Sequence, residues 1–200
     1  MILSHEIHCH ELLSRAVDEA THPLAPDANL FQPTSVMALA GSHPEPFMLL
    51  IQKADRQGYP WRNQMAFPGG HVDPEDANRE ETALRELDEE MAIPREQVTV
   101  VGSLGHFQTI KNRDIEAFLG IWDQMGDIYF DRNEISRVFR IPLRHFIQTH
   151  RDKKFYGRYP DIQELTYPYE DVVVWGVTAK IIHHLMEILP EKLNGSPLLK

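Results

Sequence analysis

The stretch FPGGHVDPEDANREETALRELDEEMAI, residues 67–93, is the most informative part of this 200-residue chain. It opens with the end of an apolar run and a tight turn, whose two glycines, Gly69 and Gly70, let the backbone approach a ligand closely. Asn78 followed three residues later by Glu81 has capping-box spacing, and no Pro or Gly interrupts the rest of the stretch. The sequence therefore predicts a strand end, a glycine turn and a helix capped by Asn78.

Three carboxylates share one face of this predicted helix. At 100° per residue, Glu89 and Glu90 each lie within about 60° of Glu86. The residues on the opposite side, which are expected to pack on a core, are Leu84, Leu87 and Met91. Like charges at this spacing destabilise a helix by a few tenths of a kcal/mol per pair. Carboxylate oxygens gathered in this way are the ligands that Mg²⁺ or Mn²⁺ prefers.

An acidic helix face, taken alone, is usually only a solvated surface. Here the glycine turn lies in front of it, and Asp73 and Asp76 add carboxylates just before the helix. Strand, turn and acidic helix together predict a cradle for a divalent ion and a phosphate.

The spacing Gly70-x5-Asp76-x8-Arg85-Glu86-Leu87-x-Glu89-Glu90-x-Ala92-Ile93 resembles the Nudix box, the strand–loop–helix of enzymes that hydrolyse nucleoside diphosphates linked to another moiety. Within that family, GGHVDPED at residues 69–76 and TALRE at residues 82–86 are similar to the coenzyme A diphosphatase branch. So are EISRVFRIPL at residues 134–143 and WGVTAKI at residues 175–181. That branch also has a second signature, upstream of this stretch, and this chain departs from it. Lys53 and Asn63 stand where the signature has Arg and Gly.

The resemblance implies an α/β fold of the Nudix type, an α/β/α sandwich with a mixed sheet. It implies Glu86 and Glu90 as the main ligands of Mg²⁺ or Mn²⁺, with the carbonyl oxygen of Gly70 as a further ligand. Glu89 would bind metal through water or activate the attacking water. Arg85, four residues before Glu89, would orient the catalytic face.

Other polar residues are candidates for contact with the substrate. The substrate-binding set is Lys53, Arg62, Phe67, Gly69 and Gly70. Further basic residues that could meet phosphates are Arg56, Lys111 and Arg113, although single basic loop residues are usually just solvated. Glu116 or Glu134 could supply a general base, but surface carboxylates are the commoner fate.

Three functions follow and stay open. The first is hydrolysis of coenzyme A or an acyl-coenzyme A to 3′,5′-ADP and a 4′-phosphopantetheine product. The second keeps the chemistry but acts on ADP-ribose, NADH or another linked nucleoside diphosphate, an alternative that the altered upstream signature supports. The third is a Nudix module that binds a nucleotide without cleaving it, which the intact carboxylate face disfavours.

Composition limits the partners. Twenty Lys and Arg against thirty Asp and Glu give a formal charge of −10, which argues against binding to nucleic acid or to an anionic membrane. An anionic substrate then needs a bridging cation. The single cysteine, Cys9, excludes an internal disulfide, and no apolar run is long enough for a membrane span. We expect a cytoplasmic protein, with a homodimer as a further expectation from the family.

The apolar pattern divides the chain into an N-terminal helix and lead-in (1–33), a Nudix domain (34–190) and a tail (191–200). The predicted strands are Thr34–Ala40, Phe47–Lys53, Gln97–Leu104 and Ile115–Trp122. The predicted helices are Glu6–Ala20 and Val172–Leu189. Glu134–Phe146 combines a turn or strand with a helix that begins near Pro142, and Arg151–Tyr169 receives no assignment.

Three remaining groups have ordinary interpretations. His5, His8, Cys9 and His10 lack a second cluster at zinc-site spacing, so a satisfied N-terminal helix is favoured. His183 and His184 are expected to straddle the edge of the last helix. The aromatic residues that could line an adenine or thiol-arm pocket, but that more often serve packing, are Trp175, Phe155, Tyr156, Tyr159, Tyr167 and Tyr169.

Overall fold

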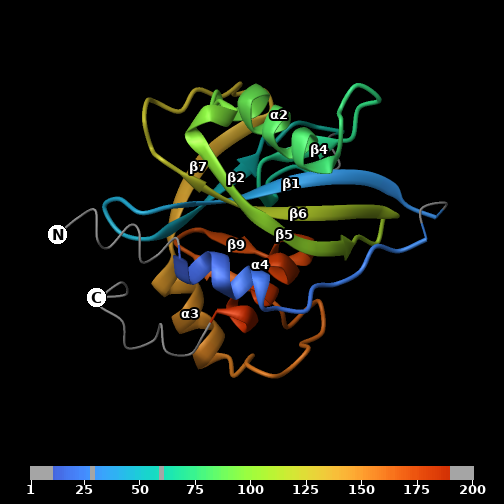
Figure 1. The fold of residues 1–200 in the computed structure, drawn as a ribbon. Helices are drawn as coiled ribbons and strands as arrows, with labels where there is room; N and C mark the ends of the chain where they lie inside the picture. The colour runs from blue at the N-terminus through green and yellow to red at the C-terminus, as the bar shows by residue number, and fades with distance from the viewer. Residues whose placement is uncertain (1–10, 28–29, 59–60, 190–200) are drawn as a thin grey trace.

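The computed structural model describes residues 11–27, 30–58 and 61–189 (Figure 1). A seven-stranded mixed sheet lies between helices on both faces, which confirms the predicted α/β/α sandwich. Its strands are β1 Gln32–Gly41, β2 Phe47–Lys53, β3 Met65–Ala66, β4 Gly69–His71, β5 Val98–Gln108, β6 Arg113–Trp122 and β7 Ile135–Pro142.

Strand β1 lies at the centre of the sheet and explains its mixed character. The main path runs β3-β2-β1-β6-β5, with β4 on β1 and β7 on β2. β1 pairs with β6 in parallel, and the other pairs in this sheet are antiparallel. Met37 and Leu39 pack in one core, whereas Val36 and Ala38 pack in the other. This alternation is expected for a strand buried on both faces.

Helix α2 Arg79–Met91, which the stretch 67–93 contains, covers one face of the sheet. The Asn78 side chain accepts a hydrogen bond from the Glu81 backbone N–H at 3.0 Å, so the predicted cap is confirmed. Ala92 ends the helix in the left-handed conformation, with φ 51°. Glycine adopts that conformation without strain, whereas it is sterically unfavourable for alanine.

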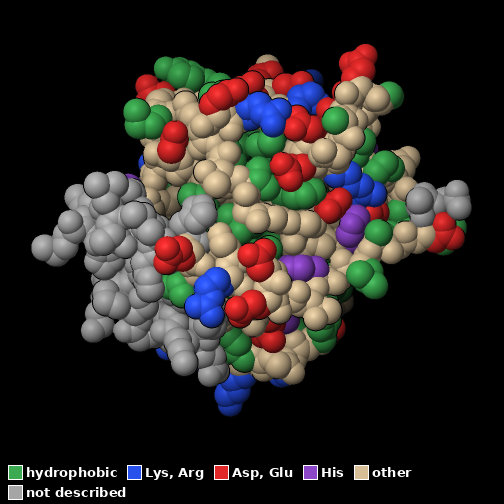
Figure 2. Space-filling model, in the orientation of Figure 1, with side chains coloured by type: hydrophobic (Ala, Val, Ile, Leu, Met, Phe, Trp, Pro, Cys, Tyr) green, Lys and Arg blue, Asp and Glu red, His purple; other side chains and the backbone are tan. Residues whose placement is uncertain are grey.

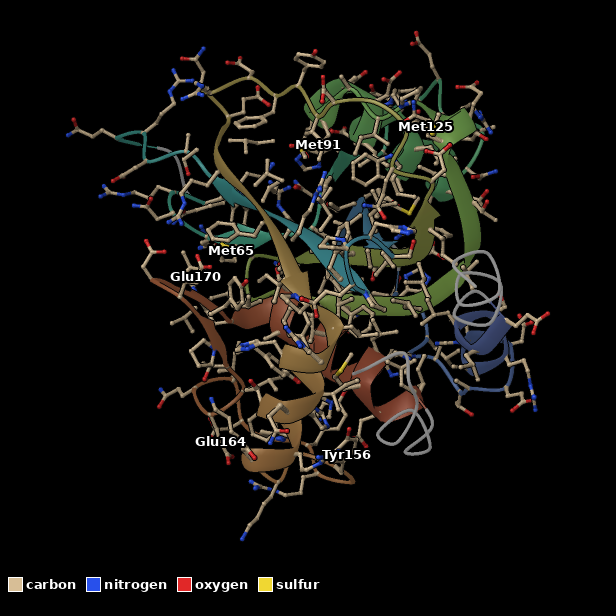
Figure 3. The ribbon with its side chains drawn as sticks, turned by 90° about the vertical axis from the view of Figure 1, so that its left-hand side faces the viewer. Met65, Met91, Met125, Tyr156, Glu164 and Glu170 are labelled. Carbon is tan, nitrogen blue, oxygen red and sulfur yellow. The ribbon has the colours of Figure 1, made fainter. Side chains whose placement is uncertain are left out.

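The opposite face carries α3 Leu143–Asp152, α4 Gly176–Ile188 and a helical segment over residues 11–18. Positions 6–10 of the predicted N-terminal helix lie outside the described residues. Figure 3 shows Tyr156 and Glu164 in the segment that follows α3, on the side of the molecule away from α2. In the part of the chain that the structure describes, no helix is long and apolar enough to cross a membrane.

Two predicted elements differ from the structure. The predicted helix Val172–Leu189 is wrong in its first turn, because Val172–Val174 forms strand β9, which pairs with β8 Tyr167–Tyr169. β-branched valines favour a strand, and Gly176 with φ +67° marks the point where the chain turns into α4. The predicted glycine turn also differs, since Gly69–His71 pairs with β1 as strand β4.

Candidate active site

Strand β4 brings backbone against the acidic face of α2. An added Cβ on Gly70 would lie 2.3 Å from the carboxylate of Glu86, and one on Gly69 would lie 2.2 Å from the carbonyl oxygen of Ser35. The backbone contact excludes a side chain at Gly69, whereas a side chain at Gly70 would displace the Glu86 carboxylate. The Gly69 N–H donates to Oε2 of Glu90 at 3.0 Å. The two glycines therefore let main chain contact both carboxylates.

Glu90 is the most enclosed carboxylate of the acidic face. Its side chain is 8% exposed, and it forms an ion pair with the Lys53 ammonium, which is itself 12% exposed. Lys53 is the last residue of β2. A buried pair of this kind is costly to break, because the remaining partner is left as an uncompensated charge.

Arg85 holds the other acidic groups together. Its Nε and one NH2 group donate to the two carboxylate oxygens of Asp76 at 3.0 and 3.1 Å. Its NH1 group donates to Glu86 at 3.0 Å and to Glu89 at 2.9 Å. NH2 also donates to the carbonyl oxygen of His71 at 3.1 Å. The expected Arg85–Glu89 pair is thus one contact of a guanidinium that ties the helix to the loop before it.

The ionised carboxylates of Glu86, Glu89 and Glu90 repel one another on the acidic face of α2. Burial raises the pKa of Glu86, the hydrogen bond from Arg85 opposes that shift, and the charges of Glu90 and Glu89 add to it. A raised carboxylate pKa means that the ionised form is disfavoured in the folded protein. A bound cation would relieve this cost.

The donor set fits a hard divalent cation. Glu86 and Glu90 present carboxylate oxygens to the same space beside the Gly70 backbone, and Glu89 lies one helical turn from Glu86. Oxygen-only ligands of this kind suit Mg²⁺ or Mn²⁺ and lack the nitrogen and sulfur ligands that structural Zn²⁺ prefers.

A pocket of about 430 Å³ opens at these residues. The sequence-predicted site residues that line it are Lys53, Phe67, Gly69, Gly70, Glu86, Glu90 and Arg113. Trp61 also lines it, with Lys111 Nζ 4.4 Å and the Arg113 guanidinium carbon 5.1 Å from its ring centroid. The pocket thus has an acidic wall and a second wall that is aromatic and basic. Figure 2 shows Lys and Arg side chains among those of Asp and Glu over α2.

Several predicted residues lie outside this pocket. Arg62 pairs with Asp55 at 2.9 Å, and both side chains are more than half exposed. Glu116 accepts from the Ser103 hydroxyl at 2.9 Å, and Glu134 is exposed. Glu89 does not line the pocket either, and its side chain is 60% exposed. The pocket lining also leaves out Arg56, Trp175, Phe155, Tyr156, Tyr159, Tyr167 and Tyr169.

Sequence reasoning missed two contributions. Trp61 stood in a polar loop with no periodic signal, so only the fold brings its ring to Arg113. Asp76 was expected to add charge to a metal cradle, but it is the main partner of Arg85. The sequence contains no signal that distinguishes an aspartate bonded to an arginine from an aspartate that binds a metal.

Asp76 should stabilise the protein in a pH-dependent way. Hydrogen bonds from Arg85 hold its pKa well below the usual range, with further bonds from the Asp73 backbone and the Thr82 hydroxyl. Its contribution is therefore present above about pH 4, the pKa in the unfolded chain, and is lost as the pH falls below that value. We expect Asp76→Asn to lower the free energy of unfolding by about 2–3 kcal/mol at pH 7. The difference from wild type should shrink at pH 3.

Urea denaturation of both proteins at pH 7 and pH 3 measures this effect. A difference that stays constant between the two pH values would show that the carboxylate charge of Asp76 is not what stabilises the fold.

Comparisons with known proteins agree with this geometry. The NUDIX domain model matches residues 31–176. Relatives from Yersinia pestis and Yersinia pseudotuberculosis, both named "Uncharacterized Nudix hydrolase NudL", are 34% identical over 146 residues, which is 72% of this chain and 73% of each relative.

Solved structures share the fold at lower identity. A MutT/nudix family protein from Enterococcus faecalis matches with a TM-score of 0.53 and 18% identity, over 88% of this chain and 68% of that one. The NUDIX domain of Shewanella oneidensis NrtR, solved with ADP ribose, matches with a TM-score of 0.52 and 18% identity, over 80% of this chain and 89% of that one.

Proposed function

This chain belongs to the Nudix family and is a Nudix hydrolase, and from that premise we propose that it cleaves the diphosphate of coenzyme A or an acyl-coenzyme A. Attack of water at phosphorus would give 3′,5′-ADP and the 4′-phosphopantetheine product. The reaction would need Mg²⁺ or Mn²⁺.

The two unlike walls of the pocket are the observation that carries this proposal. Glu86 and Glu90 on one wall suit a cation-bound diphosphate. Trp61 and Arg113 on the other offer an aromatic ring and a positive charge to a nucleotide, and Lys111, which is outside the pocket lining, places its ammonium 4.4 Å from the Trp61 ring centroid. Coenzyme A has an adenine and, unlike ADP-ribose or NADH, a 3′-phosphate that would use those additional charges. The resemblance to the coenzyme A branch supports the same substrate.

The chain's own residues can be given roles in the cleavage. Glu86 and Glu90, with the Gly70 carbonyl oxygen as a further ligand, would hold a divalent cation, which would neutralise charge on the diphosphate and polarise the attacking water. Lys53 balances the charge of Glu90. Arg85 fixes the orientation of Glu86 and Glu89 through donors only 3.0 and 2.9 Å away. Glu89 is exposed and free of the buried ion pair, so it is our candidate to orient the water and accept its proton.

An alternative substrate without the 3′-phosphate has specific support. Lys53, which replaces the arginine of the upstream signature, is already paired with Glu90 and has less charge to offer a substrate. ADP-ribose, NADH or another linked nucleoside diphosphate would then be cleaved by the same acidic face.

Product analysis tests the proposal. Coenzyme A, acetyl-coenzyme A, dephospho-coenzyme A, ADP-ribose and NADH are each incubated with the protein and Mg²⁺ or Mn²⁺. We expect coenzyme A to yield 3′,5′-ADP. Cleavage of ADP-ribose or NADH but not coenzyme A would contradict the substrate, and no turnover of any compound would favour a module that only binds nucleotides.

Arg113→Gln tests whether this arginine contacts the 3′-phosphate of coenzyme A. Loss of one charge-assisted contact to the 3′-phosphate should raise KM about 10-fold for coenzyme A. KM for dephospho-coenzyme A, which lacks that phosphate, should change little. Arg56→Gln is the matched control, because it removes the same charge from an exposed residue outside the pocket. Equal effects of Arg113→Gln on both substrates would refute a contact with the 3′-phosphate.

A further inference from the structure

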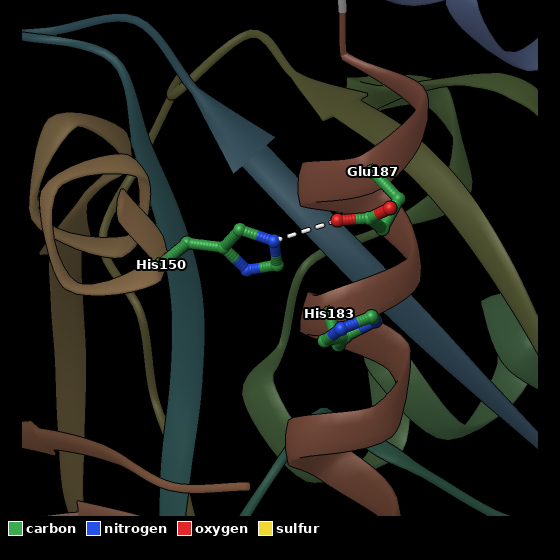
Figure 4. Close-up of side chains that lie close together, drawn as sticks. All are labelled: His150, His183 and Glu187. Atoms are coloured by element: carbon green, nitrogen blue, oxygen red, sulfur yellow. Dashed lines mark hydrogen bonds and ion pairs between the residues drawn. The ribbon is translucent and has the colours of Figure 1, made fainter. Parts of the chain in front are cut away.

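A second group of potential metal ligands lies between α3 and α4. His150 extends from α3, and His183 and Glu187 lie one turn apart on the same side of α4 (Figure 4). One ligand atom from each residue lies within 4.8 Å of the other two. None of the three lines the pocket beside α2. The group is therefore separate from the carboxylates of the candidate active site.

His183 has a buried nitrogen without a partner. The residue is 4% exposed, and its Nε2 atom has no hydrogen-bond partner among the described residues. A buried polar atom left in this way costs about 1–3 kcal/mol unless something satisfies it. Burial lowers the pKa of His183 and also that of His150, so both rings are neutral at pH 7 and offer a lone pair.

Glu187 completes the group with a negative charge. Its Oε1 atom lies 2.9 Å from Nε2 of His150, and its side chain is 28% exposed. The Gly157 N–H donates to both carboxylate oxygens, at 3.2 and 3.0 Å, and so fixes their orientation. In the described part of the chain, the ion-pair contact of Glu187 is with Nε2 of His150.

The contact made by the second ring nitrogen of His150 also suits a metal ligand. Its Nδ1 atom lies 2.8 Å from the hydroxyl of Tyr167, which is fully buried. When Nε2 binds a metal, the ring proton moves to Nδ1 and is donated to the tyrosine oxygen, so no proton is lost from the neutral ring. Histidine ligands of metals typically donate their second nitrogen in this way.

We propose that His150, His183 and Glu187 form a binding site for a zinc-class transition-metal ion that links α3 to α4. Two imidazoles and one carboxylate suit Zn²⁺, in contrast to the oxygen-only face of α2 that suits Mg²⁺ or Mn²⁺. Tetrahedral zinc with bonds of about 2.0–2.1 Å separates its ligand atoms by roughly 3.3 Å. Small rotations of the three side chains would bring their ligand atoms from the observed separations, all within 4.8 Å, to that spacing. The exposed side of Glu187 leaves the fourth position to water.

Zinc titration of the metal-stripped full-length protein against a chromogenic chelator tests the site. Glu86→Gln removes a ligand of the candidate active site and should leave one tight equivalent of Zn²⁺ bound. Glu187→Gln should weaken that equivalent at least about 100-fold, because it removes a direct ligand and even outer-shell partners are worth 10–100-fold. Gln can still contact His150 and Gly157, so this variant should fold.

His183→Gln provides a second variant with the same expected loss, and His145→Gln is the matched control. His145 also lies on α3, but it contacts the carbonyl oxygen of Pro168 at 2.7 Å and is outside the group. The visible absorption of bound Co²⁺ should follow the same pattern across the variants. The proposal is overturned if wild type binds no tight zinc, if Glu86→Gln abolishes it, or if Glu187→Gln and His183→Gln bind zinc as wild type does.

Discussion

Glu86→Gln is expected to lower kcat about 10³-fold while leaving the protein at least as stable as wild type. The loss corresponds to about 4 kcal/mol of transition-state stabilisation, the magnitude expected when a cation loses a ligand oxygen and its charge. Stability should not fall, because burial and neighbouring carboxylates already disfavour the ionised form of Glu86. A neutral amide removes that cost. Steady-state kinetics with saturating Mg²⁺ and thermal denaturation measure the two effects.

Asp88→Asn is the matched control for this substitution. Asp88 is exposed on the same helix and does not line the pocket, so kcat should stay within about twofold of wild type. Glu90→Gln is a less selective test, since it would also leave the buried Lys53 ammonium without its carboxylate. Retained activity in Glu86→Gln would refute the role of Glu86 as a metal ligand.

Arg85→Lys should lower both activity and stability, although it keeps the positive charge. Lysine has one ammonium group and cannot bond Asp76 in bidentate fashion while it also bonds Glu86, Glu89 and the carbonyl oxygen of His71. We expect kcat/KM to fall about 100-fold and the free energy of unfolding to fall by about 2–3 kcal/mol. Chemical denaturation and initial rates on the cleaved substrate measure both quantities.

Arg95→Lys makes the same chemical change at a comparable pair on the surface. Arg95 bonds Glu81 with two nitrogens, at 2.7 and 3.0 Å, but the arginine side chain is 55% exposed. Its replacement should leave both stability and kinetics close to those of wild type, because solvent screens an exposed ion pair. Equal effects of the two substitutions would mean that the buried contacts of Arg85 contribute no more than an exposed ion pair.

Local sequence patterns were sufficient to predict most of the fold. The apolar run that follows the turn residues 41–44 predicted β2 with its observed bounds, and the capping pair Asn78 and Glu81 located the start of α2. The prediction was wrong where local signals compete: Val172–Val174 continue the apolar pattern of α4, but they pair with β8 as a strand. Strand pairing depends on a partner, so a single segment cannot reveal it.

The sequence by itself determined the α/β class, the family and the three carboxylates of α2, because the spacing of residues along one helix follows from backbone geometry. Only the tertiary structure decided which charges meet. In the folded protein Lys53 pairs with Glu90, and Asp76 pairs with Arg85. Arg62 pairs with Asp55 outside the pocket, and His150 lies beside His183 and Glu187. The contacts of Lys53 with Glu90 and of His150 with Glu187 join segments far apart in the chain. The energies of all these contacts depend on burial and distance, which exist only once the sheet and its helices have packed.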